Sequence, residues 1–192
     1  MNRRLFTAAV SALLLCGVSA FAQSSSWTID PNHSQVNFQI RHMGVSNVRG
    51  SISGITGTVV WDAKDPSKSS VEATMTTKTV STNNEKRDAD LRSPNFFDVE
   101  KYPTMTFKST SVTNASGKLQ VVGDLTLGGV TKSVTLDVDG PTPPQKGQHD
   151  KLVIGFSISG LLKRSDFNFG QKYAAPILGD EVRFTIDSEA NQ

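Results

Sequence analysis

Residues 118–138 read KLQVVGDLTLGGVTKSVTLDV, and this stretch decides the fold class of the chain. Apolar side chains recur at every second position, as at Leu119 and Val121, which is the period of a half-buried strand. Between two such runs stands Gly128-Gly129, a two-residue connection whose glycines tolerate positive φ. The stretch therefore predicts a β-hairpin and, around it, an antiparallel sheet.

The same alternation predicts eight strands in all. They cover residues 35–42, 48–61, 71–79, 104–113, 118–127, 130–138, 152–161 and 181–188. Eight antiparallel strands form either a two-sheet sandwich or an up-and-down barrel, and the alternation alone leaves both open.

One short helical segment interrupts the strands. It starts after Asn83 or Asn84 as the N-cap, runs through Glu85 to Arg92, and is ended by Pro94. The irregular chain that follows carries two adjacent aromatic residues, Phe96 and Phe97. These rings must be buried, either as a lid over one end of the β structure or as ordinary core.

The charge balance limits the possible partners. The chain has 192 residues with 20 Lys and Arg against 18 Asp and Glu. This balance excludes a nucleic-acid binder that relies on bulk positive charge, and nothing in the sequence suggests a second globular domain.

The first 22 residues have the pattern of a secretory signal peptide. Arg3 and Arg4 precede an apolar stretch over 8–18, and Ala20-Phe21-Ala22 resembles a cleavage site. The stretch is shorter than the ~20 residues that a membrane-spanning helix needs. We therefore expect Sec-dependent export to the periplasm and a cleaved domain over 23–192 without a stable membrane anchor. This domain loses Cys16 and is formally neutral, because the two removed arginines account for the excess of basic residues.

The sequence contains no recognisable catalytic or metal-binding motif. His33 and His42 lie at the two ends of the strand over 35–42, too far apart to share one ion, and His149 lies in a proline-rich loop. No G-x-S-x-G nucleophile motif is present. We therefore predict no catalytic residue, no metal and no cofactor.

The clearest signal is a set of apolar side chains on the inward face of the strands. Those expected to line the interior are Phe38, Ile40, Met75, Phe107, Leu119, Val121, Phe156, Ile158 and Phe184. An eight-stranded barrel is just wide enough either to be packed solid or to hold one small ligand. Periodicity does not show whether the interior is packed solid or holds a ligand.

Longer motifs resemble the YceI-like family. The segment Asn84-x-x-Arg87-Asp88-x-Asp90-Leu91-Arg92-Ser93-Pro94-x-Phe96-Phe97-Asp98 matches the family's signature almost residue for residue, and Arg164-x-Asp166-Phe167-x-Phe169-Gly170 extends the match. The family consists of small secreted bacterial proteins whose lipocalin-like barrel binds polyisoprenoids or other long-chain lipids. One departure is Asp90, where many relatives carry histidine.

The resemblance implies an all-β, eight-stranded antiparallel lipocalin-like barrel with one short helix and an aromatic connecting segment over one end. It implies a non-catalytic periplasmic carrier or sequestering protein for an isoprenoid or similar lipid. The sequence leaves a homodimer open. Candidates for contacts with the lipid head group are Arg41, His42, Arg87 and Arg92, and Phe96 and Phe97 would form the lid. The alternatives are a small lipid-processing enzyme with His33 or His42 as base, and a solid β-domain with a structural or stress-protective role.

Overall fold

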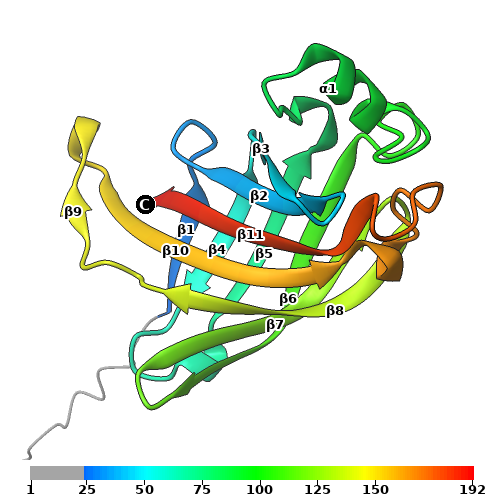
Figure 1. Cartoon of the computed structure of the whole chain (residues 1–192). Helices are drawn as coiled ribbons and strands as arrows, with labels where there is room; N and C mark the ends of the chain where they lie inside the picture. Colours follow the sequence, from blue (N-terminus) through cyan, green and yellow to red (C-terminus); the bar gives the residue numbers. More distant parts are fainter. Residues whose placement is uncertain (1–23) are drawn as a thin grey trace, which may run out of the picture.

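The computed structural model describes residues 24–192, so the predicted signal peptide lies outside it (Figure 1). These described residues form eleven strands: β1 Ser25–Ile29, β2 Gln35–His42, β3 Ser46–Ile52, β4 Thr56–Trp61, β5 Ser70–Thr76, β6 Thr104–Ala115, β7 Lys118–Leu127, β8 Val130–Asp139, β9 Gln145–Lys146, β10 Leu152–Lys163 and β11 Leu178–Asn191. The one α-helix of the described chain, α1, spans Glu85–Arg92. None of the described residues forms a helix that is long and apolar enough to cross a membrane.

The strands close into a barrel. Antiparallel pairs follow the order β1-β4-β5-β6-β7-β8-β10-β11, and β11 pairs back to β1 through Thr28 and Asn191. Strand β2 continues β1 along the same edge of β11, and β3 pairs with β2 as β4 pairs with β1. If β1 and β2 are counted as one bent strand, β3 and β4 as another, and the two-residue β9 is left out, eight strands surround the barrel. The predicted barrel is thus confirmed, and the sandwich is excluded.

Three details of the strand prediction were wrong, and one of them is that the two-residue strand β9 was not predicted. The strand predicted over 48–61 is two strands, because the chain bends after β3 and Gly54 there adopts a φ of +74°, which interrupts the pairing. Strand β1 was missed because it has only five residues, which is too short for alternation to be recognised.

Helix α1 begins and ends where the sequence predicts. The Asn84 side chain accepts a hydrogen bond from the Arg87 amide at 3.0 Å, which is the geometry of an N-cap. The helix lacks an apolar stripe, and polar contacts hold it in place. Arg92 donates from Nε to the carbonyl oxygen of Lys78 at 3.0 Å and from Nη2 to that of Val80 at 2.9 Å.

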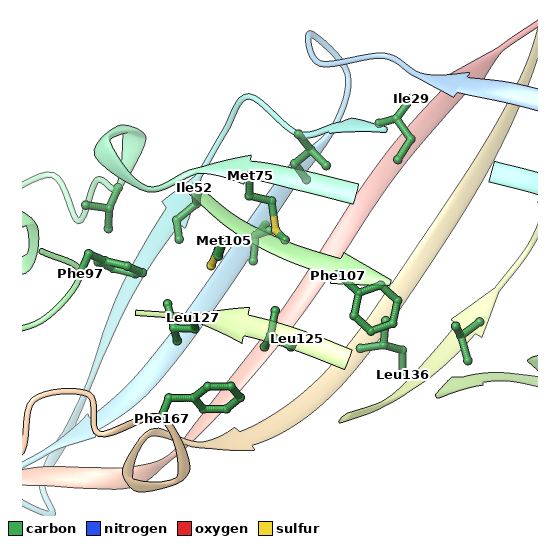
Figure 2. Close-up of a cluster of buried hydrophobic side chains, with 14 of the residues drawn as sticks. Ile29, Ile52, Met75, Phe97, Met105, Phe107, Leu125, Leu127, Leu136 and Phe167 are labelled. Atoms are coloured by element: carbon green, nitrogen blue, oxygen red, sulfur yellow. The ribbon is translucent and has the colours of Figure 1, made fainter. Parts of the chain in front are cut away.

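The interior is built from side chains that converge from many strands (Figure 2). Met75, Met105 and Leu125 come from β5, β6 and β7, which are consecutive in the sheet. Phe97 and Phe167 enter from segments outside the strands, and both are buried. The core therefore joins the barrel wall to the connections at its end.

Candidate ligand cavity

The barrel encloses a cavity of about 430 Å³ with an almost entirely apolar lining. This volume lies within the range of small-ligand pockets. The structure places on its lining all nine residues expected there from alternation: Phe38, Ile40, Met75, Phe107, Leu119, Val121, Phe156, Ile158 and Phe184.

The exposure of the side chains that line the cavity differs from strand to strand. On β6 and β7 the inward side chains, such as Phe107 and Leu119, are buried. On β2, β10 and β11 the corresponding side chains, such as Phe38, Ile158 and Phe184, are only half-buried although they line the interior. Half-buried lining side chains also lie on β4, β5 and β8, as at Trp61, Val71 and Val138, so the hollow reaches several strands of the barrel.

Three inward phenylalanines lie over glycines of the neighbouring strand: Phe38 over Gly50, Phe107 over Gly123 and Phe184 over Gly160. The absence of a side chain on each glycine lets the ring lie against the wall. A Cβ at Gly160 would overlap the Phe184 ring, and its three nearest heavy atoms all belong to that ring. These glycines therefore keep space open that the rings would otherwise occupy.

An aromatic cluster closes one end of the barrel. Phe96 and Phe97 follow α1, whereas Phe169 and Tyr173 belong to the loop before β11. The Phe97 and Phe169 rings meet edge to face with centroids 4.6 Å apart, and Phe96 stacks on Tyr173 at 5.5 Å. All four residues line the cavity. We call these four residues and the segments that carry them the cap.

Buried Arg164 holds the loop of the cap in shape. Its guanidinium donates to five backbone carbonyl oxygens, including those of Phe169 at 3.0 Å, Gly170 at 2.9 Å and Leu178 at 3.1 Å. Sequence reasoning did not assign this role. The only signal was the presence of Arg164 in the motif that resembles the family, since hydrogen bonds to backbone carbonyls leave no periodic pattern.

The four candidate head-group residues separate into two pairs. His42 and Arg87 line the cavity. Arg41 is exposed and donates to the carbonyl oxygen of Gly44 at 3.2 Å and to Asn47 at 3.3 Å. Arg92 donates to the two backbone carbonyl oxygens that anchor α1. Neither Arg41 nor Arg92 is among the lining residues.

Arg87 belongs to a network that fixes α1 at the cavity. Its Nε donates to the Thr82 hydroxyl at 2.7 Å, and that hydroxyl donates to the buried carboxylate of Asp88 at 2.5 Å. Burial acts to raise the pKa of Asp88, but hydrogen bonds from the Thr82 hydroxyl and amide, together with the charge of Arg92, hold this pKa below its usual value. Asp88 therefore remains ionised as part of the helix anchor.

Asp90 places an anionic group on the cavity lining near Arg87. Its Oδ1 accepts from Asn95 Nδ2 at 3.0 Å, and its Oδ2 accepts from the Tyr173 hydroxyl at 3.3 Å. The second bond joins α1 to the loop before β11. In this chain, Asp90 is thus a link between the two halves of the cap as well as a polar group at the cavity.

A separate cluster lies where β1 ends beside β11. His33 Nδ1 is 2.9 Å from Asp30 Oδ2 and 3.8 Å from Glu189 Oε2, and these three side chains could offer ligands to a metal ion. The hydrogen bond to Asp30, followed by the charge of Glu189, raises the pKa of His33 above its usual value. His33 is not among the cavity-lining residues, and Asp30 also accepts from the Asn32 amide. The hydrogen bonds of this cluster shape the turn between β1 and β2.

Fold and cavity together define a lipocalin-like protein, a closed antiparallel barrel with an apolar interior of ligand size. Residues 27–190 match the YceI-like domain. The chain belongs to the YceI-like family.

Relatives and solved structures agree with this assignment. Protein YceI of Salmonella arizonae is 38% identical over 172 residues, which cover 88% of this chain and 87% of that protein. The YCEI protein of Campylobacter jejuni is 33% identical with a TM-score of 0.70, over 79% of this chain and 89% of that one.

Two more distant structures share the fold. Burkholderia cenocepacia BcnA has a TM-score of 0.75 at 22% identity, over 84% of this chain and 98% of that one. A polyisoprenoid binding domain from Saccharophagus degradans, described as implicated in plant cell wall breakdown, has a TM-score of 0.62 at 14% identity, over 85% of this chain and 97% of that one.

Proposed function

We propose that this protein is a non-catalytic periplasmic carrier or sequestering protein for a long-chain isoprenoid or similar lipid held in the barrel interior. The observation that carries the proposal is the hollow apolar cavity. Each methylene-sized unit moved from water into such a cavity gains about 0.8 kcal/mol, so a partly enclosed chain supplies enough binding energy to outweigh its ordering. The name of the Saccharophagus degradans domain supports the same class of ligand.

Polar groups are needed only where the lipid head lies. The lining offers His42, Arg87, Asp90 and Tyr173 toward the cap, while Arg164 is occupied by backbone carbonyls. Arg87 suits a phosphate, and the hydroxyl of Tyr173 suits a neutral oxygen such as that of a quinone. In this proposal Phe96 and Phe97 act as the lid.

The hollow interior favours binding over a solid structural domain. An enzyme with His33 as base would need this residue beside the cavity, and His33 is not among the lining residues. His42 does lie on the lining, so the enzymatic alternative depends on this residue alone.

Trp61 offers a direct assay, because it lines the cavity and Trp27 does not. We expect a long-chain prenyl quinone to quench the fluorescence of the purified protein saturably, and a Trp61→Phe variant to lose most of the signal. Phe156→Asp should abolish binding, because an unpaired charge in an apolar cavity is costly. Saturable quenching that is equal in Phe156→Asp and the parent protein, or no quenching in the parent, would contradict the proposal.

A further inference from the structure

Two loops lie close together at the cap end of the barrel (Figure 1). Both carry exposed apolar residues. The tip of the β2–β3 hairpin carries Met43 and Val45, which are 60% and 76% exposed, and the loop before β11 carries Ile177, which is 52% exposed. Ala174, Ala175 and Pro176 precede Ile177 and are also exposed. The Met43 amide donates to the Ile177 carbonyl oxygen at 3.0 Å, so the two loops lie side by side. We call these six residues the apolar rim.

The turn itself does not explain Met43. Met43 and Gly44 have φ values of +50° and +70°, and the Val45 amide donates to the His42 carbonyl oxygen at 3.1 Å, which is the pattern of a type I′ turn. Asparagine is favoured at the first of these two positions, whereas a long apolar side chain is strained there. Since Met43 is also not buried, neither backbone conformation nor folding favours methionine at this site.

Cationic residues lie close to the rim in the chain. Residues 41–49 and 168–179 contain three exposed cationic residues, Arg41, Arg49 and Lys172, and no Asp or Glu, whereas Asp166, Asp180 and Glu181 lie just outside these segments. Exposed apolar side chains among cations are typical of a surface that binds anionic lipid bilayers.

The rim is continuous with the cavity. Ile177 belongs to both, and the residues next to the rim in the chain, His42 and Leu178, also line the cavity. A surface resting on the rim would therefore lie beside the interior of the barrel.

We propose that the apolar rim docks the protein reversibly on an anionic phospholipid surface. Lipid then passes between the bilayer and the cavity without crossing water, and this second step rests on the proposed function. A second copy of the chain fits the rim less well, because a symmetric contact would bring the cations of two identical loops together.

Vesicle co-sedimentation of the purified protein tests docking separately from cavity binding. We expect binding to vesicles of phosphatidylcholine with phosphatidylglycerol to exceed that to pure phosphatidylcholine by about fivefold for each cation that reaches the surface, and to weaken with salt. A variant with Met43→Asn, Val45→Thr and Ile177→Ser should lose at least about tenfold in binding. Leu152→Ser is the matched control and should bind vesicles as the parent does. Leu152 is 38% exposed and lies at the start of β10, away from the rim.

Thermal unfolding checks that the triple variant is folded. We expect no loss of stability from Met43→Asn, because asparagine suits this turn position better than methionine. The quinone titration should be unchanged in a second variant with Met43→Asn and Val45→Thr only, which keeps the cavity-lining Ile177 and should still bind vesicles more weakly than the parent. Loss of docking and loss of cavity binding are therefore distinguishable. Equal vesicle binding by the triple variant and the parent would overturn the inference, as would failure of the parent to bind anionic vesicles. A third result would also overturn it: sedimentation velocity shows that the parent is a dimer and the triple variant a monomer, and neither binds vesicles.

Discussion

At the residue scale, the volume of the cavity depends on single glycines. Alternation identifies Phe38, Phe107 and Phe184 as inward, but it gives no information on whether their rings fill the centre or lie along the wall. The opposing glycines settle this point, because the missing Cβ atoms leave room for the rings beside the backbone. The sequence therefore predicted which side chains face inward, whereas the open space required knowledge of which strands are neighbours.

Gly160→Ala tests this account of the cavity. The added methyl group should push the Phe184 ring into the cavity and weaken prenyl quinone binding by at least about tenfold, since two displaced methylene-sized units at about 0.8 kcal/mol each are sufficient. Fluorescence titration measures the change. Gly155→Ala on the same strand is the matched control, because its nearest neighbour would be 3.5 Å away. Adding Phe184→Leu to Gly160→Ala should restore affinity, and a failure of both the loss and the rescue would show that the ring does not control the volume.

Arg87→Gln tests the head-group site. If the guanidinium contacts a phosphate, the affinity for a prenyl phosphate should fall by about tenfold, which is the usual cost of losing a charge-assisted hydrogen bond, while prenyl quinone binding should stay within about twofold. Competition against the quinone measures both. Arg41→Gln, outside the lining, should change neither. An equal loss for phosphate and quinone would mean that Arg87 supports the cap rather than the head group.

At the scale of elements, α1 depends on polar anchors instead of an apolar face. Its position in the sequence was predictable from Asn84 and Pro94, because caps and breakers are local signals. Its place on the barrel was not, because Arg92 and Asp88 bind residues 78–82 through contacts that no periodicity reports. The contacts of Arg164, and the contact between Asp90 and Tyr173, were unpredictable for the same reason, because they join separate segments of the cap.

Asp88→Asn should remove the main polar anchor of the helix. We expect a loss of about 1.5–3 kcal/mol in the free energy of unfolding at neutral pH, because the buried hydrogen bonds to a charged acceptor are replaced by poorer ones. Denaturant unfolding measures this loss. Exposed Asp166→Asn is the control and should stay within about 0.5 kcal/mol of the parent.

The pH dependence of this effect has a definite sign. The folded pKa of Asp88 lies below its unfolded value, so its contribution is fully present above the ordinary pKa of aspartate and is lost as pH falls through the folded value. The difference between the parent and Asp88→Asn should therefore shrink below about pH 4. A difference that stays constant down to low pH would show that the ionised carboxylate is not the anchor.

At the scale of the whole molecule, closure of the barrel is what makes an interior. Alternation predicted the strands because each has one buried and one solvent-facing side. Closure requires β11 to pair with β1 and β2, more than 130 residues away. No local pattern reports such a pairing, and only the resemblance to the family favoured a barrel over a sandwich. The exposed rim also had no sequence signal, because Met43, Val45 and Ile177 resemble core residues until the fold places them outside.

The proposed function depends on a long-chain lipid bound in the barrel interior. Native mass spectrometry of the protein, purified gently from its own host, tests it most directly. We expect a co-purifying molecule of isoprenoid or similar lipid mass in the parent protein and bare protein in Phe156→Asp. Bare parent protein that also fails to take up added prenyl lipids would contradict the claim.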